Sequence, residues 1–219
     1  HNRRGVIMLI KSKKVWSSSQ FLPLILEVEN NKIVAVYDYD HFDKVDYDFG
    51  SNRVLPGFID IHTHGAYGYD TNDATEEGLR NWTKNLPSEG VTSFLPTTIT
   101  QTEEVLLKAV ANVAKVYREG YEGSEILGIH FEGPYLDAEK RGAQPLSCIQ
   151  TPSVEQFKKF QEASDNLIKL ITIACEKDVD YKLTKYLVSQ GIRVSLGHSA
   201  CNYKESYLKR QNRLVPRWA

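Results

Sequence analysis

The stretch LPGFIDIHTHG, residues 55–65, decides the predicted fold. It opens with a Pro-Gly break, continues as a short apolar strand at residues 58–62, and ends in His62, His64 and Gly65. Downstream of it, short apolar segments alternate with helical stretches, which is the pattern of βαβ units and a parallel sheet. Upstream of it, the sequence is strand-like, so we expect two parts with a boundary near residue 54.

The part after this boundary is predicted to contain about five strand–helix units. Thr100 or Thr102, each followed by glutamates, is a candidate helix cap, and so is Thr151 before Pro152 at a first helical position. The strands are expected at residues 58–62, 92–95, 126–131, 168–174 and 193–196, and the helices at residues 75–86, 102–118, 153–163 and 181–189.

The fold class that follows is α/β, an incomplete TIM-type (β/α) barrel preceded by a small β element. An eight-stranded barrel takes about 250 residues, so five units indicate either an open sheet or part of a barrel. Residues 201–219 favour part of a barrel, because basic side chains there surround few apolar residues and no sixth strand is expected. Residues 214–219 resemble neither a strand nor a capped helix. We therefore expect a partial barrel at residues 55–200 and an atypical tail, truncated or frame-shifted, at residues 201–219.

Residues 1–54 are predicted to form a small, sandwich-like β element. Apolar runs at residues 6–10, 24–28 and 33–37 have strand character, and Asn30-Asn31 is a turn signal between the last two.

The two histidines that close the opening motif are candidate metal ligands. Side chains at i and i+2 of a strand point to the same face, and at the carboxyl end of a barrel strand that face is the interior. Taken alone, His-x-His is more often a surface or hydrogen-bonded pair. The preceding apolar strand and Gly65, which permits close approach of the backbone, favour metal binding by His62 and His64.

A second motif, GIHFEGP at residues 128–134, places a carboxylate at the end of another strand. Glu132 is the candidate ligand, with an exposed glutamate at the strand end as the alternative. His130 shares its face one step deeper, and we interpret it as a core residue or a support for the ligands.

A third strand, at residues 193–196, delivers His198 at its carboxyl end. The carboxyl ends of a parallel barrel open on one face, so His62, His64, Glu132 and His198 are predicted to meet there. Imidazole and carboxylate suit Zn²⁺ or Fe²⁺, one or two ions, and leave positions open for water. Such a metal lowers the pKa of bound water and polarises a carbonyl, which indicates amide or ester hydrolysis.

Other features of the second part are less specific. Thr97-Thr98 either lines the pocket or caps the backbone, and Cys175-Glu176 has no base partner that would make a nucleophile. The loop at residues 142–145, which includes Ala143 and Gln144, is equally well read as a substrate contact and as an ordinary turn.

Net charge, apolar run length and cysteine spacing indicate which partners and which cellular compartment the chain suits. A net charge of −1 gives no electrostatic footprint for nucleic acid. No apolar run approaches the roughly 20 residues of a membrane span. Three cysteines without C-x-x-C spacing, Cys148, Cys175 and Cys201, fit a reducing cytoplasm and no disulfide framework.

These motifs together resemble the N-acetylglucosamine-6-phosphate deacetylases of the amidohydrolase superfamily. The matching stretches are LPGFIDIHTHG (55–65), GVTSFLPTT (90–98), GIHFEGPYLDAEKRGAQP (128–145) and SLGHSA (195–200). The resemblance implies hydrolysis of the acetamide of an amino-sugar phosphate, with Glu132 and His198 as metal ligands and His62 and His64 able to hold a second metal. It also implies substrate contacts at Ala143 and Gln144, although the family usually has a histidine at the latter position.

The family pattern contains further elements that residues 1–219 do not match. These are a T-H-x-F-N-A-M-like strand with another histidine ligand, a catalytic aspartate, and an Arg and a His that hold the sugar phosphate. We therefore expect no catalytic aspartate in this chain, weak or substoichiometric metal binding and impaired turnover. Exposed strand edges favour a homo-oligomer. The alternatives are a different amidohydrolase and a non-catalytic, metal-binding or oligomerising remnant.

Overall fold

The computed structural model describes residues 7–202 of the chain. These residues belong to two compact units that divide after Gly57. The expected tail at residues 201–219 lies almost entirely outside the described residues.

The first unit is a small β-sheet in the order β3-β2-β1-β4, with β5 also paired to β1. Two antiparallel hairpins build most of it, and each turns through a pair of residues with positive φ, Ser18-Ser19 and Asn30-Asn31. The sequence predicted the asparagine turn but not the serine turn. The strands are β1 (Ile7–Ser17), β2 (Gln20–Glu29), β3 (Lys32–Asp38), β4 (Tyr47–Asp48) and β5 (Arg53–Val54).

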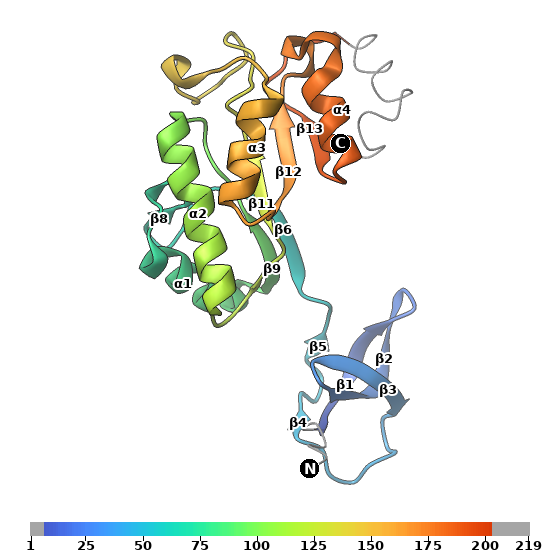
Figure 1. The fold of residues 1–219 in the computed structure, drawn as a ribbon. Coiled ribbons are helices and arrows are strands. Elements are labelled where there is room, and N and C mark those ends of the chain that lie inside the picture. Colours follow the sequence, from blue (N-terminus) through green and yellow to red (C-terminus); the bar gives the residue numbers. More distant parts are fainter. Residues whose placement is uncertain (1–6, 203–219) are drawn as a thin grey trace. The chain divides into compact units, whose positions relative to one another are not determined.

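The second unit is built on parallel strands (Figure 1). Three strands form the order β10-β9-β6 and three form β11-β12-β13, and a bridge between Thr97 and His130 joins the two sets. The antiparallel pair β7 (Gly65–Ala66) and β8 (Tyr69–Asp70) follows the first strand. The parallel strands are β6 (Phe58–Thr63), β9 (Val91–Pro96), β10 (Glu125–Ile126), β11 (Ile129–Glu132), β12 (Ile168–Ile173) and β13 (Arg193–Leu196).

Four α-helices cover one face of these strands, so the predicted α/β class is confirmed (Figure 1). Each helix packs on the next in sequence, and their apolar sides enclose a core in which Trp82, Phe94 and Phe131 are almost fully buried. The helices are α1 (Glu76–Asn85), α2 (Glu103–Glu119), α3 (Val154–Ala163) and α4 (Lys182–Ser189), and short 3₁₀ turns lie at Thr71–Asp73, Leu86–Glu89, Leu146–Cys148, Cys175–Lys177 and Val179–Tyr181.

The strand expected at residues 126–131 is wrong in one respect, because it is two strands. Gly128 has φ of +147°, and its missing side chain leaves room for the Leu167 carbonyl and Lys169. The chain therefore changes partner at this glycine: β10 pairs with β9, whereas β11 pairs with β12.

Of the proposed helix caps, Thr102 is confirmed and Thr151 is wrong. The cap of α2 is Thr102, whose hydroxyl accepts from the Val105 amide, and not Thr100. The cap of α3 is Ser153, whose hydroxyl accepts from the Gln156 amide, so Pro152 lies before the helix and not at its first position.

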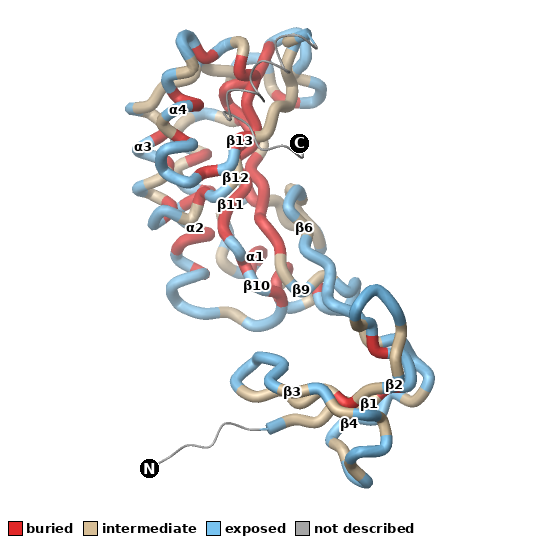
Figure 2. The backbone as a smooth tube through the Cα atoms, turned by 90° about the vertical axis from the view of Figure 1, so that its right-hand side faces the viewer, coloured by how far each residue is buried: buried red, intermediate tan, exposed pale blue. Residues whose placement is uncertain are grey.

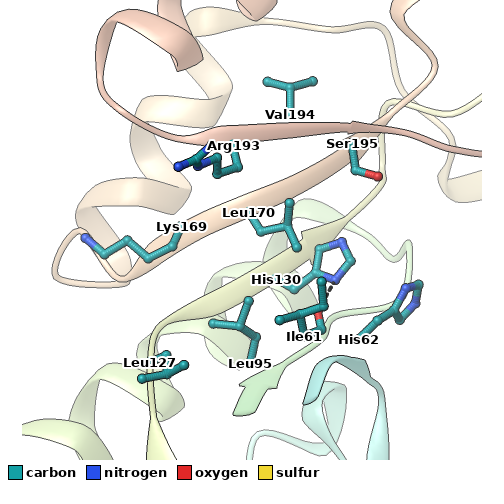
Figure 3. Close-up of a pocket in the computed structure, with 10 residues that line it drawn as sticks. All are labelled: Ile61, His62, Leu95, Leu127, His130, Lys169, Leu170, Arg193, Val194 and Ser195. Carbon is teal, nitrogen blue, oxygen red and sulfur yellow. Dashed lines mark hydrogen bonds between the residues drawn. The ribbon is translucent and has the colours of Figure 1, made fainter. Parts of the chain in front are cut away.

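The face of the strands that the helices do not cover is open. Figure 2 shows β11 and β12 largely buried and β6 largely exposed, and on β6 the side chains of Phe58, Ile59 and Ile61 are exposed. A groove of about 350 Å³ runs along this face, lined mainly by apolar side chains such as Leu95, Leu127 and Leu170 (Figure 3). Within residues 7–202, β6 and β13 have no strand on their outer sides, and the strands do not close into a barrel.

None of the helices within residues 7–202 is both long enough and apolar enough to cross a membrane.

Candidate metal centre

The four predicted ligand residues lie at the carboxyl ends of three parallel strands. His62 lies on β6 and His64 directly follows it, Glu132 ends β11, and His198 comes two residues after β13. Because parallel strands deliver their carboxyl ends to one edge, segments that are far apart in sequence meet there.

The side chains of these residues converge on one carboxylate. Glu132 Oε1 lies 3.5 Å from His62 Nε2 and 3.4 Å from His198 Nε2, while Glu132 Oε2 lies 3.2 Å from His64 Nε2. The Nε2 atoms of His62 and His64 are 3.3 Å apart. Potential ligand atoms of His62, His64 and Glu132 all lie within 4.8 Å of one another, a grouping suited to a metal ion.

Backbone carbonyls orient two of the imidazoles. His64 Nδ1 lies 3.2 Å from the Thr97 carbonyl and His198 Nδ1 lies 3.0 Å from the Lys140 carbonyl. A carbonyl can only accept, so each Nδ1–H donates to its carbonyl, and Nε2 is the nitrogen of each ring that faces Glu132. An imidazole that donates its other N–H to a carbonyl is the usual arrangement of a metal-ligating histidine.

Glu132 is a buried carboxylate, only 3% exposed. Burial alone raises the pKa of its carboxyl group, but the hydrogen bond from His64 and the charges of the neighbouring histidines outweigh burial and lower that pKa. Gln144 Nε2 also donates to Glu132 Oε2 at 2.8 Å. The carboxylate is therefore held ionised, as a metal ligand must be.

The hydrogen bond to Glu132 is the main cause that raises the pKa of His64, and burial opposes it. A ring protonated on both nitrogens cannot ligate a metal. Binding of a cation at this nitrogen is therefore expected to release a proton.

His130 lies beneath the cluster with both ring nitrogens engaged. Its Nδ1 lies 2.9 Å from the Ile61 carbonyl and its Nε2 lies 2.8 Å from the Thr172 hydroxyl (Figure 3 shows the first contact). Burial lowers the pKa of His130 to about 4. This ring is a neutral core residue that braces the strand carrying His62.

The buried imidazole predicts a pH dependence of folding. His130 has a pKa of about 4 when folded and about 6.5 when unfolded. Between pH 4 and pH 6.5 this histidine is therefore protonated in the unfolded chain but neutral in the folded one. Its contribution is fully present above pH 6.5 and is lost as the pH falls toward 4, with a total of about 3 kcal/mol. Urea unfolding at pH 7 and pH 5 with a chelator present measures this loss. His130→Asn should remove that part of the pH dependence, and an unchanged slope in the variant contradicts the assignment.

The other residues that the sequence analysis singled out make structural contacts near the four predicted ligands. Gln144 is buried, and its two amide atoms contact Glu132 and the Thr100 backbone amide, while Ala143 precedes it in the same loop. Thr97 holds the strand ends through its hydroxyl, which accepts from the Thr63 amide. The Glu176 carboxylate accepts from the Ser199 hydroxyl.

Sequence reasoning missed the carbonyls of Thr97 and Lys140 as orienting groups. It also missed Asp137, which is 4% exposed and lies in the loop after β11. No motif marks a backbone carbonyl, so only the fold could reveal these contacts.

A fold and a cluster of this kind define a class of metal-dependent hydrolases, and comparison with known proteins agrees. Residues 53–184 match the model of the amidohydrolase family, and this chain belongs to that family.

Its relatives include the N-acetylglucosamine-6-phosphate deacetylases. The Bacillus subtilis enzyme of that name is 44% identical over 150 residues, which cover 67% of this chain and 38% of the enzyme. The Vibrio furnissii enzyme is 36% identical over 180 residues, which cover 81% of this chain and 45% of the enzyme. This chain thus spans less than half the length of these curated relatives, and it corresponds to their amino-terminal portion.

Solved structures agree. A substituted form of the Mycobacterium smegmatis deacetylase, in complex with N-acetyl-D-glucosamine-6-phosphate, superposes with a TM-score of 0.85 at 27% identity and covers 94% of this chain and 54% of that one. The Pasteurella multocida deacetylase gives a TM-score of 0.81 at 30% identity, with coverage of 94% and 54%.

Proposed function

We propose that this chain provides the metal-binding portion of a hydrolase that removes the acetyl group from N-acetylglucosamine 6-phosphate, giving glucosamine 6-phosphate and acetate. The observation that carries the proposal is the buried carboxylate of Glu132 with three imidazole Nε2 atoms within 3.5 Å of its oxygens. The similarity to deacetylases of this name supports the choice of substrate.

The residues fit a divalent metal, and we assign His62, His64, Glu132 and His198 to hold it. Two of the imidazoles are already oriented by carbonyls, and the carboxylate is kept ionised. Mixed nitrogen and oxygen donors favour Zn²⁺ or Fe²⁺, as one or two ions. A bound metal of this kind supplies an activated water and polarises the acetamide carbonyl.

Chain residues other than these ligands would bind and orient the substrate. We place Ala143 and Gln144 next to the amino sugar, on the loop after β11. The amide of Gln144 is occupied by Glu132 and Thr100, so its remaining contribution is to shape the pocket wall. Turnover also needs a general base, and residues 1–219 contain no residue that matches the family's catalytic aspartate, so we expect this chain by itself to be impaired.

We also propose a cytoplasmic location, on the cysteine spacing, and association with further copies through the open edges of β6 and β13. Sedimentation of the purified chain tests the association: a single monomeric species over a range of concentrations contradicts it.

Acetate release tests the function. The chimera to use joins residues 1–200 of this chain to the portion of the Bacillus subtilis relative that follows its own matching segment. We expect the chimera to release acetate from N-acetylglucosamine 6-phosphate, and the same chimera with Glu132→Gln to release none. A folded, metal-loaded chimera that is inactive contradicts the proposal.

The same assay distinguishes N-acetylglucosamine 6-phosphate from N-acetylgalactosamine 6-phosphate as the substrate. An N-acetylgalactosamine-6-phosphate deacetylase of Escherichia coli O157:H7 is 30% identical over 153 residues. Faster turnover of the galactosamine compound would therefore reassign the substrate while leaving the reaction unchanged.

A further inference from the structure

One residue of a different loop fixes both the backbone and the ring of His198. The residue is Asp137, which lies in the segment between β11 and α3, and its backbone N–H donates to the His198 carbonyl at 2.9 Å. His198 itself has φ of +50°, a conformation that non-glycine residues adopt rarely. The hydrogen bond from Asp137 therefore fixes an otherwise disfavoured backbone.

The ring of His198 is fixed through the side chain of Asp137. Its Oδ1 accepts from the Glu139 amide at 2.8 Å and the Lys140 amide at 3.2 Å, which closes a tight turn. The carbonyl of Lys140 at the end of this turn is the group that accepts from His198 Nδ1. The carboxylate thus sets the position of the carbonyl that selects the tautomer of His198.

A salt bridge anchors this turn to the end of the neighbouring strand. Asp137 Oδ2 lies 2.6 Å from Lys177 Nζ, in the segment after β12. The hydrogen bond from Lys177 is the main cause that lowers the pKa of Asp137, so its carboxylate stays ionised. The turn after β11, the end of β12 and the segment after β13 are in this way tied together at one point.

We propose that Asp137 is a positioning residue for His198: it orders the turn whose Lys140 carbonyl keeps the proton on Nδ1 and leaves Nε2 available to a metal. This inference rests on the proposed metal site but goes beyond it, because Asp137 itself contacts neither Glu132 nor the Nε2 edge of His198 in the structure. Residues that orient a ligand in this way commonly change metal affinity by about 10- to 100-fold when they are replaced.

The test is Asp137→Ala, with Asp178→Ala as the matched control. Asp178 is an equally buried aspartate that accepts from the Leu183 and Thr184 amides at the start of α4, and none of its hydrogen bonds leads to His198. Both variants lose stabilising hydrogen bonds, but only Asp137→Ala should disturb His198. Asp137→Asn keeps the Oδ1 acceptor for the Glu139 and Lys140 amides but loses the salt bridge to Lys177, so it should keep the turn and the tautomer of His198.

Two readouts are needed. Nitrogen-15 NMR of the histidine side chains, with a chelator present, reports the tautomer of each ring, and calorimetric titration with Zn²⁺ reports affinity. For Asp137→Ala we expect His198 to lose its Nδ1–H tautomer and the affinity to fall about 10-fold or more. In Asp178→Ala both should remain at the wild-type values, and in Asp137→Asn the tautomer of His198 should remain.

An unchanged His198 tautomer in Asp137→Ala overturns the inference, and so does an equal effect in Asp178→Ala. Should Asp137→Ala not fold, Asp137→Ser serves, because its single short oxygen cannot hold both amides and Lys177, and a fully retained tautomer there overturns the inference equally. If the wild-type chain binds no Zn²⁺, the proposed function fails, whereas the tautomer measurement still tests Asp137.

Discussion

Glu132→Gln abolishes the binding of divalent metal in this account, with a loss of affinity of at least about 100-fold. The expected loss exceeds that for a supporting residue, because the variant removes the negative charge of the carboxylate whose two oxygens three imidazoles face. Glutamine has nearly the same shape and keeps an oxygen that can accept from Gln144, so the fold should persist. Calorimetric titration with Zn²⁺ measures the change.

The matched control is Glu104→Gln, the same substitution at an exposed carboxylate on α2 that pairs with Lys108. It should leave Zn²⁺ affinity unchanged. Equal affinities in Glu132→Gln and the wild type would remove this carboxylate from the site. Circular dichroism of both variants confirms that lost binding is not lost folding.

Gly123→Ala adds a single methyl group and is expected to destabilise the second unit strongly. Gly123 has φ of +93°, and an added Cβ would lie 2.0 Å from the Thr83 carbonyl oxygen, which also accepts from the Ser124 amide. Backbone strain and the clash together should lower the free energy of unfolding by about 4 kcal/mol. Urea denaturation followed by tryptophan fluorescence measures it, since Trp82 lies buried on the same helix as Thr83.

Gly90→Ala separates the clash from the strain. Gly90 also has a positive φ, +80°, but an added Cβ would meet only the Phe58 ring at 3.5 Å, an ordinary contact. We expect a loss of about 1 kcal/mol there. Losses of equal size at both glycines would show that the close approach to Thr83 costs little.

Strand parity explains why the sequence predicts so much of the candidate site. His62 and His64 alternate with Thr63, and the strand ends at Glu132 and before His198 are marked by glycines, so convergence follows from a parallel sheet alone. The same reasoning places His130 deeper on the strand of Glu132.

The parts that could not be predicted depend on contacts between distant segments. The division of residues 126–131 into two strands depends on the backbone angle at Gly128 and on the change of partner from β9 to β12. The choice of Ser153 rather than Thr151 as the cap of α3 depends on one hydrogen bond from the Gln156 amide. The orienting carbonyls of Thr97 and Lys140 carry no side-chain signature at all.

The most direct test of the central claim is a Zn²⁺ titration of the wild-type chain beside a variant in which His62 and His64 are both replaced by alanine. The account predicts saturable binding in the wild type and a loss of that binding in the variant. Release of protons should accompany binding, since the pKa of His64 is raised before the metal arrives. Absence of saturable binding in the wild type, or equal binding in the double variant, would contradict the claim that these residues form a metal centre.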